Sequence, residues 1–451
     1  MKERNLTQGP IFSCLIRFSL PMIAGNLLQQ AYNLVDTLLV GRYLGPDALA
    51  AVGSSYTLMV FITSILIGLC MGSGAFFSAD YGAGETGQLR QDIRLSFWFL
   101  LGVTALLYLI VYPCMRPILR LLQIPGELME VTEQYVYAVF TGLVFVFLYN
   151  YYAYLLRALG NTGVPLVFLA LSAVTNIGLD IWFIAGLKMG VRGAAWATVI
   201  AQGMSGIGIA VYALCKLPLL RQGPRRAESD GKRLLELMVG DTATGIQQSV
   251  MNFGILMIQG LVNRFGPSVM AAFAAAVKID TLAYMPAQEF GNAYSLFVSQ
   301  NYGAGTHERI RRGTRLAMGT CVGFCCLVSV AVFFGAEWLM QLFIDRGETE
   351  ILAQGATYLR IEGSMYAAIG ILFLWYGYFR GYGRPHISLI LTAVSLGTRV
   401  LLAYALAPNT PLGVRAIWYA IPIGWLLADL AGWIFCRHLK IPAVSPADAP
   451  Q

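Results

Sequence analysis

Charged residues are scarce in this sequence. Asp, Glu, Lys and Arg make up 12% of the 451 residues, whereas a soluble globular domain carries roughly 25% charged residues. Because 57% of the residues are hydrophobic, the chain is predicted to be an all-α polytopic membrane protein. The formal charge of +7 does not indicate nucleic-acid binding, because the basic residues lie in short segments between apolar runs.

Several chemical motifs are also missing. The three histidines form no H-E-x-x-H arrangement, and the chain has no G-x-S-x-G segment, so a membrane enzyme is disfavoured. The eight cysteines form no C-x-x-C pair and are expected to be small core residues rather than disulfides or metal ligands. No cofactor is expected. The sequence also lacks the phosphate loop G-x-x-x-x-G-K-[ST], so any work done by the chain is expected to draw on an ion gradient.

What the sequence does have is long apolar runs, of which Ile11–Val40 is the first and most informative. About 20 helical residues already cross a bilayer. Within this run Gln29, Tyr32, Asn33 and Asp36 recur at helical spacing and therefore share one face. An aspartate at the bilayer centre costs about 2.5–3.5 kcal/mol on insertion scales. Asp36 is therefore predicted to line a polar cavity; the alternative is a hydrogen bond that only fixes helix packing.

Twelve such runs are expected to be transmembrane helices, six on either side of a basic linker. The predicted domains are an N-lobe over residues 1–218, a cytoplasmic linker over 219–233 and a C-lobe over 234–451. Most of the 31 Lys and Arg residues fall on the side of the membrane that holds the linker. The positive-inside rule therefore places both termini in the cytoplasm.

The two halves repeat one another. Tyr-Gly-Ala-Gly occurs at residues 81–84 and 302–305, and Gly-Pro occurs at 45–46 and 266–267, both at an offset of 221. Six helices per half give parallel repeats around a shared cavity, the usual design for alternating access. The Tyr-Gly-Ala-Gly segments are expected to end a helix with a tight turn and to hold cytoplasmic loops rather than bind a substrate.

Polar residues that differ between the halves are the candidates for chemistry. Asn176 and Asp180 lie four residues apart on one helix face, and Asp36 is expected at a similar depth, so the two carboxyl groups are predicted to share a proton. In the second half Glu289 lies beside a helix-interior proline, and Arg399 lies in helix eleven. Purely structural roles remain the alternative for each of them.

These residues resemble the multidrug and toxic compound extrusion (MATE) family, in its prokaryotic branch similar to DinF and MepA. The resemblance covers nearly the whole chain. It is carried by Pro21, Gln29-Gln30, Asp36, Val40-Gly41-Arg42, the segments 48–53, 81–84 and 157–160, and Asn176 with Asp180.

The resemblance implies a V-shaped, two-lobed antiporter of twelve transmembrane helices, multi-pass in the bacterial inner membrane and working as a monomer. It would export cationic amphipathic drugs in exchange for protons or sodium ions. The family's N-lobe network, carried over, comprises Asp36, Asn150, Asn176, Asp180 and Thr198. One departure concerns helix ten, where the segment 366–379 has no acid, so a sodium site in the C-lobe is not expected.

A second function with the same fold stays open, namely a flippase for lipid-linked precursors. That function requires a more basic cavity, for which Lys278 and Arg399 are the candidates. Drug spectrum, coupling ion and oligomeric state are not decided by the sequence.

Overall fold

The computed structural model describes residues 5–121, 124, 126–220 and 230–438, and every regular element in these ranges is a helix. The predicted all-helical class is therefore confirmed. The first repeat contains α1 (Ile11–Leu44), α2 (Pro46–Ala83), α3 (Thr86–Leu121), α4 (Gly126–Thr141), α5 (Leu143–Ala158), α6 (Gly163–Asp180), a π-helical turn η1 (Ile181–Gly186), α7 (Val191–Lys216) and the 3-10 turn η2 (Pro218–Leu220). The second contains α8 (Asp230–Val262), the 3-10 turn η3 (Asn263–Phe265), α9 (Pro267–Gly303), α10 (His307–Met340), α11 (Thr349–Gly363), α12 (Tyr366–Gly381), α13 (Pro385–Leu406) and α14 (Val414–His438).

Most of these helices are long and apolar enough to cross a bilayer. Among the described residues nine single helices meet that requirement, and the pair α4–α5, bent by 41°, adds a tenth span. Neither α8, which contains the buried Asp241, nor the pair α11–α12, which contains the buried Glu362, meets that requirement. The described residues therefore support up to ten of the twelve expected spans.

The chain divides into two compact units. Unit 1 comprises Met1–Asn5 and Leu20–Ser249, and unit 2 comprises Leu6–Ser19 and Val250–Gln451. Most of the linker, residues 221–229, lies outside the described ranges. The first helix of each repeat is shared: α1 begins in unit 2 and continues in unit 1, whereas α8 begins in unit 1 and continues in unit 2.

The backbone repeats as the sequence does. The helices α2 and α9 both begin at a Gly-Pro step and both end at a glycine turn, in which Gly84 has φ 74° and Gly305 has φ 68°. A left-handed φ is the conformation that glycine adopts without strain, so the predicted turn after each Tyr-Gly-Ala-Gly segment is confirmed. Later in each repeat the broken helix α4–α5 recurs as α11–α12.

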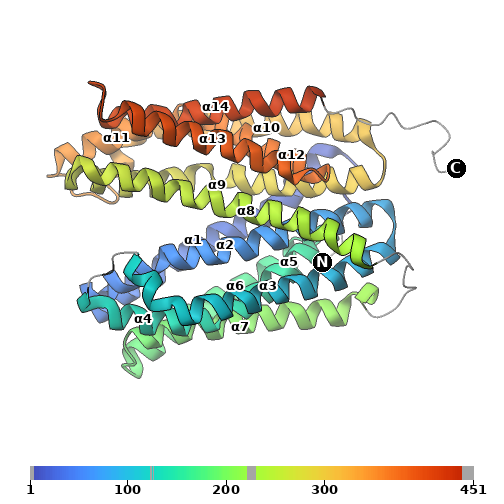
Figure 1. Ribbon diagram of the computed structural model, residues 1–451, viewed down its shortest axis with the longest axis horizontal. Helices are drawn as coiled ribbons and strands as arrows, with labels where there is room; N and C mark the ends of the chain where they lie inside the picture. Colours follow the sequence, from blue (N-terminus) through green and yellow to red (C-terminus); the bar gives the residue numbers. More distant parts are fainter. Residues whose placement is uncertain (1–4, 122–123, 125, 221–229, 439–451) are drawn as a thin grey trace. The chain divides into compact units, whose positions relative to one another are not determined.

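Small residues bring helices together inside each unit. In unit 2 a Cβ added to Gly377 in α12 would lie 2.5 Å from the carbonyl oxygen of Gly291 in α9, and one added to Gly424 in α14 would lie 2.4 Å from that of Ser395 in α13. Such backbone approach is how helices pack in lipid, where no hydrophobic driving force acts between them. In unit 1 α2 packs on α5, and α5 and α6 pack on α7 (Figure 1).

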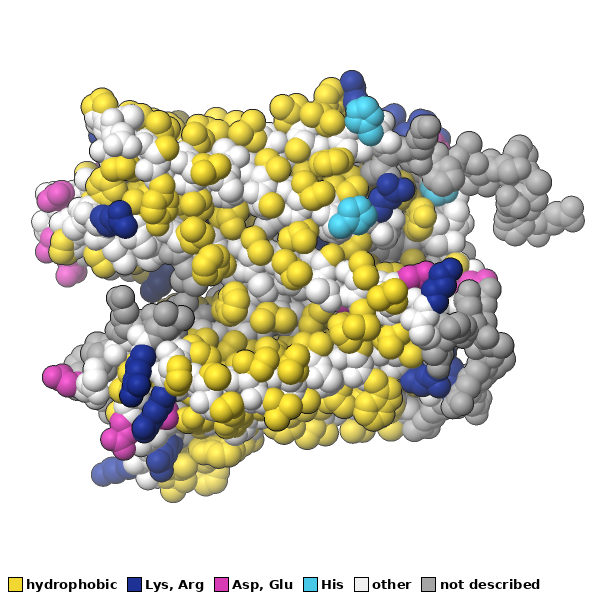
Figure 2. All heavy atoms as spheres, in the orientation of Figure 1, with side chains coloured by type: hydrophobic (Ala, Val, Ile, Leu, Met, Phe, Trp, Pro, Cys, Tyr) yellow, Lys and Arg dark blue, Asp and Glu magenta, His cyan; other side chains and the backbone are white. Residues whose placement is uncertain are grey.

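Hydrophobic side chains cover the helix flanks. Figure 2 shows them spread over the visible sides of the helices, with Lys, Arg, Asp and Glu concentrated towards the helix ends. Phe334 is 79% and Leu109 is 73% exposed, as suits a surface that faces lipid. The described cysteines form no disulfide. Three are buried, whereas Cys114, Cys215 and Cys326 are exposed, so the expectation of core cysteines holds for only part of the set.

Candidate functional site

Asp36 and Asp180 come together in unit 1. Asp36 projects from α1, and Asp180 is the fully buried last residue of α6, at the point where the backbone passes into the π-helical turn η1. The two carboxyl groups interact with one another. Neither oxygen of Asp180, nor Oδ1 of Asp36, has a donor in the described part of the chain. Since ionised carboxylates only accept, a hydrogen bond between them requires a proton on one of the two.

Tyrosines surround this acid pair. Tyr135 of α4, which is buried, interacts electrostatically with Asp36, Asp180 and Tyr32. Tyr32 hydrogen-bonds with Gln29 on the same face of α1, as the spacing predicts, and also interacts with Asp36. The sequence reasoning did not single out Tyr135, although a tyrosine within an apolar helix was a visible signal.

Asn176 and Asn150, the two amide side chains predicted to belong to the site, differ in their hydrogen bonds. Asn176 is buried on α6, and its Nδ2 donates to Oγ1 of Thr198 in α7 over 3.5 Å. The Thr198 hydroxyl donates to Ala194 of its own helix. Asn150 also bonds within its own helix, because its Nδ2 donates to the Val146 carbonyl over 2.9 Å. The described hydrogen bonds therefore join Asn176 to Thr198 and leave Asn150 apart.

Unit 2 contains a second buried acid pair that the sequence reasoning missed. Asp280 of α9 and Glu362 of α11 are 4% and 1% exposed. Asp280 interacts with Glu362 and with the hydroxyls of Tyr358 and Tyr366, and Arg399 of α13 interacts electrostatically with both acids. The statement that residues 366–379 of helix ten hold no acid is correct, but Glu362 lies in the same broken helix, just before its break.

Glu289 belongs to a different group of contacts. It lies about 13 Å further along α9 than Asp280, by the rise of a helix. Its Oε1 accepts from Asn292 over 3.2 Å, and the Asn292 oxygen accepts in turn from Arg380 of α12 over 3.1 Å. Arg380 also donates to Ser295. Glu289 and Arg399 thus lie in unit 2, in two separate clusters, whereas the other predicted site residues lie in unit 1.

Comparison with known proteins identifies the family. The sequence profile of the MatE family matches residues 21–182 and 243–405, one segment in each repeat. The chain belongs to the MatE family. Among curated relatives it is 28% identical over 440 residues to the probable multidrug resistance protein YpnP of Bacillus subtilis, covering 97% of each chain. It is also 24% identical over 458 residues to a FAD transporter of Shewanella oneidensis, covering 98% of each.

Solved structures agree on the fold. A structure described as the outward-facing conformation of a multidrug resistance MATE family transporter of the MOP superfamily superposes with a TM-score of 0.90 at 24% identity, over 97% of this chain and 98% of that one. The MatE chain is accordingly a polytopic membrane transporter of a multidrug efflux family, and not an enzyme. In the described part of the chain no three His, Cys, Asp or Glu side chains are grouped so as to hold a metal ion.

Proposed function

We propose that this MatE-family chain is a secondary antiporter that exports cationic amphipathic compounds in exchange for protons, by alternating access in the bacterial inner membrane. The observation that carries the proposal is the interaction of the Asp36 and Asp180 carboxyl groups, of which Asp180 is fully buried. With one shared proton this pair has a charge of −1, which attracts a cation. With a second proton it is neutral, and the attraction is lost.

The surroundings suit an organic cation. Tyr32 and Tyr135 interact with the acids, and Tyr56 and Tyr149 interact with Tyr32. Aromatic rings beside a carboxylate attract both the charge and the apolar body of an amphipathic cation. Proton uptake from outside would release the bound compound, and proton release inside would restore the negative charge of the site for the next molecule.

An anionic cargo is the second candidate, since one relative is named a FAD transporter and a flippase for lipid-linked precursors would share the fold. An anion requires an unmatched positive charge in its site. Arg399 interacts with both Asp280 and Glu362, and the Lys278 side chain is exposed. These contacts favour the cation.

The test is transport in proteoliposomes, with proton and sodium gradients imposed separately. A proton gradient is expected to drive movement of ethidium, a cationic dye, and Asp36→Asn is expected to abolish that movement while the protein stays folded. Glu308→Gln, at an ion-paired carboxylate about half exposed on α10, is the matched control. Wild-type transport by Asp36→Asn would refute the proposed role of the pair, and movement driven by sodium alone would refute proton coupling.

A further inference from the structure

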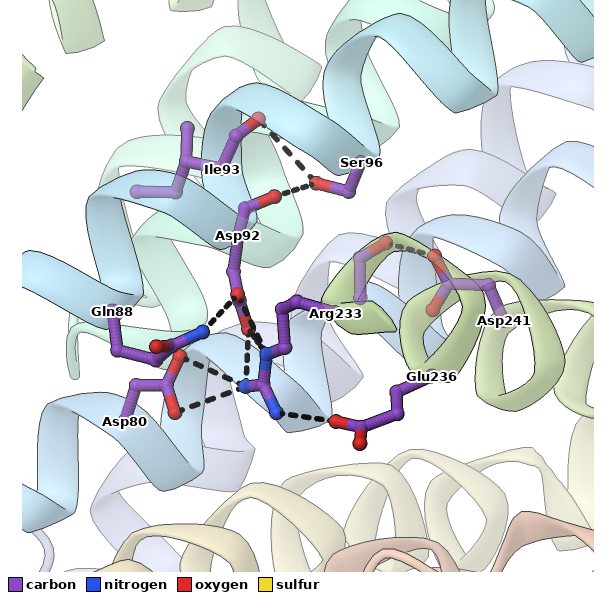
Figure 3. Close-up of polar contacts among 9 residues, drawn as sticks. Asp80, Gln88, Asp92, Ile93, Ser96, Arg233, Glu236 and Asp241 are labelled. Atoms are coloured by element: carbon purple, nitrogen blue, oxygen red, sulfur yellow. Dashed lines mark hydrogen bonds and ion pairs between the residues drawn. The ribbon is translucent and has the colours of Figure 1, made fainter. Parts of the chain in front are cut away.

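Arg233 is the centre of an ion cluster where α8 begins. Its guanidinium lies between three carboxylates (Figure 3): Nη2 is 2.5 Å from Oδ2 of Asp92 in α3 and 3.3 Å from Oδ1 of Asp80 in α2, and Nη1 is 3.2 Å from Glu236. Asp92 is fully buried and also accepts from Gln88 over 3.0 Å. All of these residues belong to unit 1.

Beyond this cluster the first half of α8 packs closely on α2. Oδ2 of the buried Asp241 accepts from the Ser73 hydroxyl over 2.5 Å. A Cβ on Gly72 would lie 2.7 Å from Cα of Asp241, and one on Gly68 would lie 2.7 Å from Cα of Gly245. The two helices therefore meet backbone to backbone along this stretch, just before α8 passes into unit 2 at Val250.

The repeat provides a counterpart in unit 2 that is held by hydrogen bonds to backbone groups. Asp80 immediately precedes the first Tyr-Gly-Ala-Gly segment, and Asn301 immediately precedes the second. Asn301 donates to the carbonyl of Leu6, and the Leu6 amide donates to Gln300. Each of the two equivalent positions thus holds the chain that leads into the other repeat's first helix. Asp80 does so through an ion pair with Arg233. Asn301 does so by donating to a backbone carbonyl, and Arg309 of α10 donates to the carbonyls of Leu6, Gln8 and Gly9 beside it.

This difference has a consequence for motion. Removing one partner of a buried ion pair leaves uncompensated charge and costs several times more than losing a surface pair. Without Arg233, Asp80 and Asp92 would repel one another at the start of α8. Backbone hydrogen bonds such as those of Leu6 carry no such charge balance. The attachment of α8 is therefore the one that depends on a balance of opposite charges.

We propose that Arg233, with Asp80 and Asp92, is a releasable latch that holds the first half of α8 on α2, and that its release is a conformational step of the transport cycle. The role of release in the transport cycle rests on the alternating access proposed above. The existence of the latch can be tested without cargo or gradient, so the two claims can fail separately.

Cys70 is a built-in reporter for the undocking of α8. Its thiol is fully buried on α2 and interacts electrostatically with Asp241 of α8. Cys321 and Cys325 are buried in unit 2 and report global unfolding, whereas Cys215, which is exposed near the end of α7, calibrates the dose of reagent. The full chain is labelled with the membrane-permeable thiol reagent N-ethylmaleimide. Peptide mass spectrometry then gives the labelling rate of each cysteine in the same sample.

Arg233→Gln is expected to speed the labelling of Cys70 at least about tenfold while Cys325 stays protected. Arg233→Lys, which keeps the charge but loses the planar fork, is expected to fall in between. Arg312→Gln, at an exposed ion pair with Glu308, and Asn301→Ala, at the counterpart in unit 2, are expected to leave Cys70 as in the wild type. An unchanged Cys70 rate in Arg233→Gln, or an equal rise at Cys325, would overturn the latch.

The role of the latch in the transport cycle is tested by measuring the labelling rate of Cys70 in the wild-type protein during transport. Ethidium transport under a proton gradient is expected to raise the Cys70 rate above that of the resting protein. If Arg233→Gln exposes Cys70 but turnover does not, the latch exists and its place in the cycle is refuted.

Discussion

Tyr135 and Tyr358 occupy equivalent positions in the two repeats, and each interacts with a buried carboxyl pair of its own unit. The offset of 223 between them is the one that relates Arg157 to Arg380. Tyr135 interacts with Asp36 and Asp180, and Tyr358 interacts with Glu362 and Asp280. The duplicated scaffold therefore keeps a tyrosine beside the acids in both units, although the acids come from non-equivalent helix positions.

The first prediction concerns the Tyr135 hydroxyl. Tyr135→Phe keeps the ring but removes a polar group beside the acid pair, and is expected to slow proton-driven transport about threefold to tenfold, the effect of about one hydrogen bond. The rate of ethidium movement into proteoliposomes measures it. Tyr137→Phe is the matched control, because the Tyr137 hydroxyl donates to the Tyr112 carbonyl and not to the acid pair. Equal losses in both variants would show that Tyr135 contributes only packing.

Helical periodicity limits how much of this site could be predicted from the sequence. Spacing places residues on a helix face, and it correctly put Gln29, Tyr32 and Asp36 together on α1. Periodicity does not say which helices face one another. The contact of Asp280 with Glu362 depends on how α9 packs against α11, and Asn150, included through family resemblance, bonds to its own helix instead.

The second prediction concerns the positive charge in unit 2. Arg399→Gln removes the positive charge that interacts with Asp280 and Glu362, and is expected to lower the free energy of unfolding by more than the loss of an exposed ion pair does, that is by more than about 1 kcal/mol. The loss should be larger at about pH 8 than at about pH 5, because protons bound at low pH replace the missing charge. Thermal unfolding in detergent measures both. Arg360→Gln, at an exposed pair with Glu337, should cost at most about 1 kcal/mol; a similar loss in both variants would contradict the assignment.

The third prediction concerns backbone contact between α9 and α12. A Cβ at residue 377 would lie 2.5 Å from the Gly291 carbonyl oxygen, so Gly377→Ala must push the two helices apart. We expect a sharp drop in the yield of monodisperse protein and in its melting temperature. Gly323→Ala, at an exposed position of α10 with no atom within 4 Å of the added Cβ, is the control and should be neutral or stabilising. Tolerance of Gly377→Ala would show that the two helices can separate at little cost.

The fourth prediction follows from the sharing of α1 and α8 between the units. Unit 1 includes the first half of α8, and unit 2 includes Leu6–Ser19 from the start of the chain. A chain cut within the linker should therefore form neither unit from one fragment alone. We expect residues 1–224 and 225–451, expressed together, to co-purify and to transport ethidium, whereas either fragment expressed alone should be degraded.

The control for this experiment blocks the contact of α8 with α2. Gly72→Leu places a side chain where even a Cβ would lie 2.7 Å from Asp241, and it should prevent co-purification of the two fragments. Arg233→Gln should weaken co-purification less, because it removes the ion cluster but leaves the glycine contact intact. A fragment 1–224 that is stable alone, and that holds Cys70 protected from N-ethylmaleimide, would show that α8 is not needed to complete unit 1.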